Sequence, residues 1–195
     1  CPMQGEFPAF RELYQDEATL RMAVGAALVE AEGYCRWTRL REVGEFSRSL
    51  GLVRLGIAHC PDMAPEAARV ADYLAGFGLE PLLPTSTADH APLSQARELA
   101  ELGTDLNLLA GMCVGHEAMF LKASQAPVVS LVARDARLRH NPVAALYTSR
   151  SYLKDDVFGH WSTAERPAFK GWEMDTLERA TGQALLRGGA NRSRV

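Results

Sequence analysis

The sequence predicts an α/β protein in which an open, mainly parallel sheet carries helices on both faces. Between residues 52 and 135, short aliphatic runs alternate with segments of helical periodicity. Parallel strands need a long crossover, usually a helix, so this alternation is typical of the class. We therefore expect a flavodoxin-like or Rossmann-like sheet, with helices before it and a tail after it.

Residues 1–51 are expected to form an irregular lead-in and two helices that pack on the main domain. Apolar residues recur at helical spacing across residues 16–33, and a second helix is predicted over 38–50, ending at Gly51. The apolar face of the first helix consists of Leu20, Val24, Ala27, Leu28 and Ala31. Cys35 lies between the two helices and is predicted to be part of the core.

Residues 52–154 are expected to form the α/β domain. The predicted strands are 52–60, 79–85, 104–113 and 126–135. The predicted helices between them are 65–78, 93–103 and 114–125. Pro81 and Pro84 interrupt the second strand, which indicates an edge position or an early end because proline cannot donate to a ladder.

Residues 155–195 form a separate C-terminal extension in this interpretation. The segment is polar, contains Trp161 and Trp172, and ends in GGANRSRV, which is typical of a frayed terminus. The two tryptophans suggest that the extension could pack on a second subunit, so a homo-oligomer is one expectation.

Composition excludes several classes of partner. The 195-residue chain has a net charge of −3, which gives no electrostatic basis for binding nucleic acid. No apolar run approaches the roughly 20 residues that span a bilayer. Four cysteines are too few for a disulfide scaffold, so we expect a cytoplasmic protein with reduced thiols. We find no basic leader followed by an apolar stretch and a cleavage site. The chain opens with Cys1 rather than methionine, so a fragment or a trimmed chain is expected.

Cysteine and histidine residues follow the predicted strands on one side of the sheet. Cys60 closes the first strand and Cys113 the third, and these strands are neighbours if the strand order is 2-1-3-4. His116 opens the next helix, and His140 follows the fourth strand. Ligands of open α/β sheets bind beyond the carboxyl ends of the strands, near the point where strand order reverses. A site is therefore expected at this edge.

Each of these residues also has a purely structural interpretation. Cys113 could be a small apolar plug at a strand end, because free cysteine is among the most buried residue types. His116 could hydrogen-bond the preceding loop, and His140 could cap a turn with Asn141. Their convergence on one edge, rather than any single residue, favours a functional site.

Three chemistries fit such a site. Two thiolates and two imidazoles are a sufficient set for tetrahedral zinc, and they also suit iron or copper. Alternatively, Cys113 is the nucleophile of a metal-free enzyme, with His116 or His140 as base and Asn141 as an orienting or oxyanion group. A third possibility is a non-catalytic module that holds an anion on the amides of residues 114–116. No glycine-rich phosphate motif supports the third.

Four segments carry a resemblance to known proteins. They are EAEGYCRWTRLREVGEFSRSLG, RLGIAHC, TDLNLLAGMCVGHEAMFLKASQAPVVSLVARD and HNPVAALY. In these segments, which lie between about residues 16 and 150, the chain resembles a family of small, uncharacterised prokaryotic proteins described only as metal-binding. The resemblance implies an α/β fold and a cysteine-rich N-terminal segment ending near Cys-Pro-Met, of which Cys1-Pro2-Met3 would be the remnant.

The sequence departs from the family pattern after the second strand. Family members carry a longer loop there, with one cysteine and then Cys-Asn-Pro, whereas this chain has a short loop and His90-Ala91-Pro92. Histidine preserves a zinc ligand but not a disulfide partner or a nucleophile, so the change favours a metal over thiol redox chemistry. It also disfavours a cluster that needs four thiolates.

The sequence thus predicts a metal site of unassigned activity, with zinc first and iron second. It leaves open whether the metal is catalytic and which small molecule the protein binds. The predicted ligands are Cys60, Cys113, His116, His140 and His90. Glu117 or Asp135 could orient a ligating histidine by accepting its second ring N–H.

Overall fold

The computed structural model describes residues 12–85 and 91–154. The chain divides into two compact units, residues 1–147 and 148–195, and every element named below belongs to the first. His90, Trp161 and Trp172 lie outside the described residues, as do the lead-in before residue 12 and the tail after residue 154.

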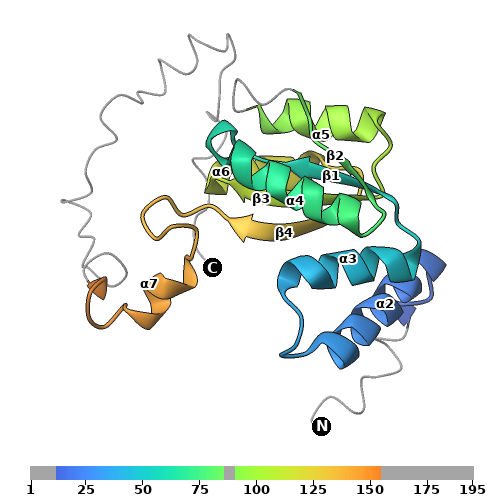
Figure 1. The fold of residues 1–195 in the computed structure, drawn as a ribbon, viewed down its shortest axis with the longest axis horizontal. Coiled ribbons are helices and arrows are strands. Elements are labelled where there is room, and N and C mark those ends of the chain that lie inside the picture. The colour runs from blue at the N-terminus through green and yellow to red at the C-terminus, as the bar shows by residue number, and fades with distance from the viewer. Residues whose placement is uncertain (1–11, 86–90, 155–195) are drawn as a thin grey trace, which may run out of the picture. The chain divides into compact units, whose positions relative to one another are not determined.

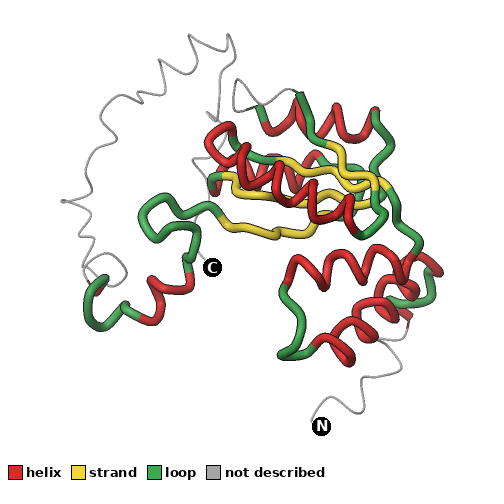
Figure 2. The backbone as a smooth tube through the Cα atoms, viewed as in Figure 1, coloured by secondary structure: helices red, strands yellow, loops and turns green. Residues whose placement is uncertain are grey.

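The first unit is an α/β structure with a four-stranded, wholly parallel sheet in the order β2-β1-β3-β4 (Figures 1 and 2). The strands are β1 (Arg54–Ala58), β2 (Glu80–Leu82), β3 (Leu106–Met112) and β4 (Val128–Ala133). The helices are α2 (Glu17–Gly33), α3 (Arg39–Leu50), the 3-10 turn η2 (Pro61–Met63), α4 (Ala64–Gly76), α5 (Pro92–Glu101), α6 (Val114–Ala123) and α7 (Val143–Tyr147). The predicted fold class and the edge position of the second strand are confirmed, and the strand order is the 2-1-3-4 that was considered.

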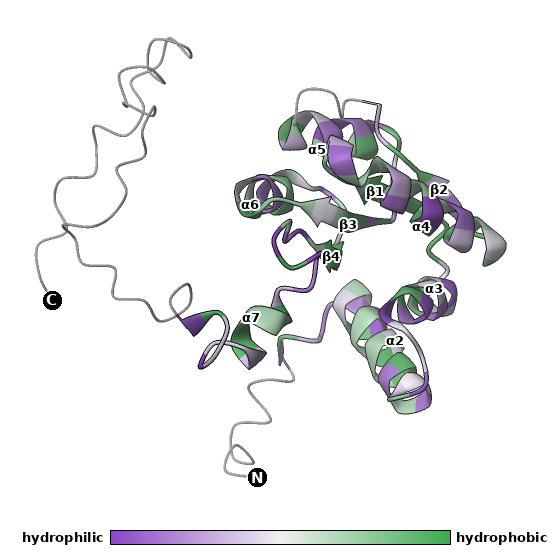
Figure 3. Ribbon diagram, turned by 60° about the vertical axis from the view of Figure 1, so that its left-hand side comes forward, coloured by the Kyte–Doolittle hydropathy of each residue, from purple (hydrophilic) through white to green (hydrophobic). Residues whose placement is uncertain are grey.

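Apolar side chains pack on both faces of the sheet. On one face, β1 and β3 contribute to a core that also contains residues of α3 and α4, such as Val43 and Leu74. On the other face, a second core contains residues of α5 and α6, such as Leu99 and Phe120. The strands appear mostly in the hydrophobic colour in Figure 3. Burial on both faces explains why β3 is a continuous apolar run rather than an alternating one.

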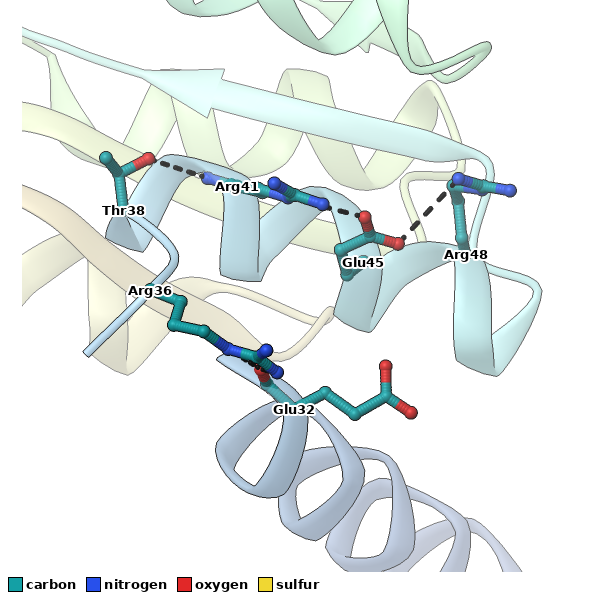
Figure 4. A network of polar contacts seen from close by, with 6 residues as sticks. All are labelled: Glu32, Arg36, Thr38, Arg41, Glu45 and Arg48. Carbon is teal, nitrogen blue, oxygen red and sulfur yellow. Dashed lines mark hydrogen bonds and ion pairs between the residues drawn. The ribbon is translucent and has the colours of Figure 1, made fainter. Parts of the chain in front are cut away.

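Helix α3 begins and ends at the residues that its sequence indicates. The Thr38 hydroxyl accepts the Arg41 amide at 3.3 Å, and Gly51 ends the helix in the left-handed conformation, with φ of 71°. On the exposed side of the helix, Glu45 lies between Arg41 and Arg48 at 3.6 and 3.7 Å (Figure 4). Surface pairs of this kind contribute little to stability.

The link between α2 and α3 overturns one prediction. Cys35 is exposed rather than part of the core, and it adopts φ of 55°. The link turns sharply here, and the Arg36 Nε donates back to the Glu32 carbonyl at 3.0 Å (Figure 4). A tight turn after a helix directs side chains outward, which sequence spacing alone did not indicate.

Helix α2 keeps its apolar face, but that face is only partly covered. Leu20, Val24 and Leu28 remain about half exposed, at 48%, 51% and 51%. The buried residues of the helix are Gly25 and Gly33, where a Cβ atom would meet Leu50 and Trp37 respectively. Close approach at glycine therefore replaces interdigitation of the leucines. Among the described residues, no helix is long and apolar enough to cross a membrane.

Adding a side chain at Gly56 in β1 should strongly reduce the stability of the protein. A Cβ atom there would lie 2.2 Å from Asn107 Oδ1 and 2.8 Å from Leu99 Cδ1. Gly56→Ala should lower the free energy of unfolding by about 1–3 kcal/mol, because overpacking a closed core forces its neighbours to move. Urea unfolding followed by circular dichroism measures this loss.

Gly76→Ala is the matched control. Gly76 is the last residue of α4, and nothing lies within 4 Å of its Cβ position, so this variant should be neutral or slightly stabilised. Equal stabilities for the two variants would contradict the packing described for Gly56.

Candidate metal centre

Cys60 is held at the carboxyl end of β1 by its main chain. Its N–H donates to the Gly111 carbonyl of the neighbouring strand at 3.4 Å, and its own carbonyl accepts the Met63 amide at 2.9 Å. Pro61 then opens η2, where its fixed φ and missing N–H suit the first position of a helical turn. The Cys60 side chain is 3% exposed. The thiol is thus buried where the strand turns into the α4 segment.

Gln95 of α5 fixes the residue before Cys60. Its side-chain Oε1 accepts the His59 N–H at 3.1 Å, and its Nε2 donates to the His59 carbonyl at 2.9 Å. His59 itself is buried and its Nδ1 lies 3.2 Å from the Ile57 carbonyl oxygen. A buried amide that satisfies both main-chain groups of one residue sets the position of the strand end. Sequence analysis missed this role, because one glutamine within a helix carries no local signal.

An irregularity in β3 lies next to the second cysteine. The pairing of β3 with β4 shifts between Ala110 and Met112, and Gly111 adopts φ of 88°, a conformation that favours glycine. A Cβ atom at Gly111 would lie 2.7 Å from Met63. After this bulge Met112 faces the same core as Leu109, whereas strict alternation would place it on the opposite face. The bulge therefore redirects the chain immediately before Cys113.

Cys113 and His116 lie at the start of α6. Cys113 is the N-cap residue, with extended φ and ψ of −71° and 156°, and its carbonyl accepts the Glu117 amide at 2.9 Å. Both Cys113 and His116 are partly exposed, although the Nδ1 atom of His116 is shielded from solvent. The Cys113 thiol therefore lies at the N-terminal end of α6 and is partly open to solvent.

The structure brings three of the predicted residues together. One ligand atom each of Cys60, Cys113 and His116 lie within 4.8 Å of one another, a spacing at which they could hold a metal ion. Among the described residues, 12–85 and 91–154, these three form the group of His, Cys, Asp or Glu side chains whose ligand atoms lie that close together. The strand ends supply the two sulfurs, and the first turn of the helix supplies the imidazole.

The surroundings of Cys60 shift the pKa of its thiol in opposite directions. Burial raises the pKa of the Cys60 thiol above its ordinary value of 9.0, and this effect outweighs the hydrogen bond from the Cys113 main chain and the charge of Arg134, which lower the pKa. The charges of Cys113 and Asp62 raise it further. Without a cation, the buried thiol therefore keeps its proton at neutral pH.

Arg134 and Asp62 form an ion pair at the same edge, which sequence analysis did not predict. The Arg134 Nε donates to Asp62 Oδ2 at 3.1 Å, and its Nη2 contacts the same oxygen. The hydrogen bond with Asp62 raises the pKa of Arg134, and the charges of Cys60 and Cys113 raise it further. A signal was present, since Asp62 follows Cys60 by two positions and Arg134 directly follows β4.

His140 is not part of the three-residue group. The His140 ring Nδ1 accepts the Asp135 main-chain N–H at 3.3 Å, and the His140 main-chain N–H donates to the Asp135 carbonyl at 2.8 Å. Arg139 and His140 both adopt positive φ, at 52° and 65°, so this segment forms a closed turn after β4. The arrangement matches the capping alternative, and a ligand role for His140 would have to use Nε2. That role stays a prediction.

The remaining predicted residues have local structural partners or lie outside the description. Asp135 Oδ1 accepts the Leu138 amide at 2.9 Å, within the turn that contains His140. Asn141 is exposed and its carbonyl accepts the Ala144 amide at the start of α7, a short helix that was not predicted. The suggestion that Glu117 or Asp135 orients a ligating histidine stays a prediction, as does the role of His90.

These observations define the protein as an α/β protein with a sulfur and imidazole group at the carboxyl edge of its parallel sheet. The chain belongs to a protein family of unknown function, DUF1847, whose model matches residues 2–88 and 84–131. It is also 33% identical to an uncharacterised protein of Methanocaldococcus jannaschii, MJ0455, over 162 residues, which are 73% of this chain and 83% of that protein. No solved structure matches the chain significantly. The predicted membership of an uncharacterised family is confirmed, and the comparisons assign no metal.

The raised pKa of Cys60 predicts an unusual pH dependence of its alkylation. At any pH below that pKa, less of Cys60 is thiolate than in an ordinary thiol, and only thiolate reacts with iodoacetamide. In chelator-treated protein, the alkylation rate of Cys60 should therefore reach half its maximum above pH 9.0.

Peptide mass spectrometry after timed alkylation measures this midpoint for Cys60 separately from the other thiols. The midpoint is the quantity to compare, because limited access slows the reaction at every pH and does not move the midpoint. A midpoint at or below 9.0 would show that burial does not control the ionisation of this thiol.

Proposed function

We propose that the protein binds a thiophilic divalent metal ion, zinc first and iron second, through Cys60, Cys113 and His116. The observation that carries the proposal is the approach of the three ligand atoms to within 4.8 Å of one another. A cation placed among atoms at this spacing can contact all of them, since zinc–sulfur and zinc–nitrogen bonds are about 2.0–2.3 Å long. The three side chains come from segments far apart in the sequence.

The donor set supports zinc as the first choice. Two thiolates and one imidazole are ligands that zinc favours, and the two thiolate charges balance the charge of the ion. Iron accepts the same donors and is the second choice. Three protein ligands are also what catalytic zinc sites provide, with the fourth position left for water or substrate. The site therefore fits a metal that acts on a small molecule.

Metal binding would also stabilise the thiolate form of Cys60, which its buried environment disfavours. Burial raises the pKa of its thiol, so a free thiolate is disfavoured at neutral pH. A bound cation supplies the missing charge and releases the thiol proton, so binding strengthens as pH rises towards that pKa. The proposal requires reduced thiols, which agrees with a reducing compartment such as the cytoplasm.

The position of Cys113 supports a second candidate, a metal-free cysteine enzyme. Cys113 is partly exposed at the start of α6, and its sulfur lies within 4.8 Å of a His116 ring nitrogen, where an imidazole could act as base. The two candidates differ in how a chelator acts. Alkylation of Cys113 that speeds up on adding chelator favours the metal, whereas rapid alkylation without chelator favours the nucleophile.

Elemental analysis of the purified chain tests the metal proposal. We expect about one zinc or iron ion per chain, and a fall of more than about tenfold in metal affinity in Cys113→Ala and His116→Ala, because each removes a ligand. Inductively coupled plasma mass spectrometry measures the content, and competition with a chromogenic chelator measures the affinity.

Cys35→Ala is the matched control for the loss of a thiol, because Cys35 is exposed and outside the group. It should keep the full metal content. A parent protein that holds no metal after purification without chelators and after reconstitution would rule out the proposal. Equal loss of metal in the Cys35 variant would mean that binding does not depend on this group.

A further inference from the structure

The ion pair between Arg134 and Asp62 crosses the end of the strand that carries Cys113. Asp62 lies in η2, just after β1, and Arg134 directly follows β4. β3 lies between β1 and β4 in the sheet, and its last residue, Met112, pairs with Ala133. A contact between the segments after β1 and β4 must therefore pass the carboxyl end of β3, where Cys113 lies. The guanidinium is thus placed beside the proposed metal centre.

The electrostatics of the two thiols agree with this placement. The guanidinium of Arg134 interacts electrostatically with both Cys60 and Cys113, so its charge lies near both sulfurs. The Arg134 side chain is 26% exposed, so part of it remains accessible from solvent. The positive charge of Arg134, which acts on both sulfurs, would also attract an anion bound to a metal ion between them.

Asp62 binds only one edge of the Arg134 guanidinium. A single carboxylate oxygen, Oδ2, accepts from Nε and Nη2, which form one edge of the group. Arginine carries five N–H donors, and the Nη1 edge can donate to a second acceptor. Asp62 is 50% exposed, so water screens part of its charge. The pair therefore positions Arg134 while leaving it able to bind another anion.

We propose that Arg134 selects an oxyanion, such as the carboxylate of a small molecule, as the ligand that completes the metal's coordination. This inference rests on the proposed metal site with three protein ligands. A divalent ion bound by two thiolates and a neutral imidazole has no net charge, so the metal alone does not favour an anion over water. Arg134 supplies the positive charge, and its planar fork matches the geometry of a carboxylate.

Acetate binding to the cobalt-loaded 195-residue chain tests this inference. Cobalt(II) takes the place of zinc, and its absorption bands change when a ligand enters the coordination sphere. We expect acetate to shift these bands in the parent, and Arg134→Gln to weaken acetate binding about tenfold, because one charge-assisted hydrogen bond is lost. Cobalt affinity itself should change less than about twofold, since no ligand is removed.

Arg97→Gln is the matched control for the loss of one arginine charge. Arg97 also pairs with a carboxylate, that of Glu101 at 2.9 Å, but it lies on the exposed side of α5. This variant should bind acetate as the parent does. Equal weakening in both arginine variants would show a general charge effect and overturn the inference.

Asp62→Asn separates selection from a structural role of the ion pair. It removes the carboxylate charge, but the asparagine Oδ1 can still accept from the guanidinium, so Arg134 keeps its position and its charge. Acetate should therefore bind as tightly as in the parent or more tightly. If Asp62→Asn weakens acetate as much as Arg134→Gln, the pair acts structurally and the inference fails. If the glutamine variant does not fold, Arg134→Lys tests the planar fork instead, because it keeps the charge and loses the bidentate geometry; it should weaken acetate binding, and unchanged binding would remove the role of the guanidinium.

The two proposals fail in different ways. A parent chain that binds no cobalt would overturn the metal site and the inference with it. A parent that binds cobalt but shows no spectral response to acetate, or the same response in Arg134→Gln, would leave the metal site standing and remove the role of Arg134.

Discussion

The parallel pairing of β1 with β3 is the constraint on which the candidate site depends. The two strands pair from Leu55 with Leu106 to Ala58 with Leu109, and the Cys60 N–H extends the contact to Gly111. Main-chain hydrogen bonds, rather than any attraction between the thiols, therefore bring two distant cysteines to one edge. The apolar cores on both faces fix the pairing, because a slip of one residue would reverse which side chains each face buries.

Two local devices adjust the ends of those strands. Gln95 binds both main-chain groups of His59 and so holds the turn that contains Cys60. Gly111, with its positive φ, lets β3 bulge before Cys113 while staying close to Met63. The site thus combines a rigid sheet with two irregular strand ends, an arrangement that places ligands more accurately than a free loop does. The cost is a buried thiol whose ionisation needs a compensating charge.

Much of the architecture followed from local patterns in the sequence. Alternating aliphatic and helical segments predicted every strand of the described sheet and its parallel character, because helical crossovers join parallel strands. They left the strand order as one of several possibilities. The patterns failed where exposure depends on a distant partner. Cys35 is exposed in the turn between α2 and α3, and the apolar face of α2 is half exposed because α2 packs through glycines.

The sequence by itself determined the fold class and the edge of the sheet at which Cys60, Cys113 and His116 meet. Hydrophobic periodicity and strand polarity are local properties, and they are enough to place residues at the ends of particular strands. Only the tertiary structure decided that His140 instead turns back on Asp135 and that Arg134 reaches Asp62 across the end of β3. Such contacts join side chains from separate segments, and their geometry depends on the packing of the whole domain rather than on spacing along the chain.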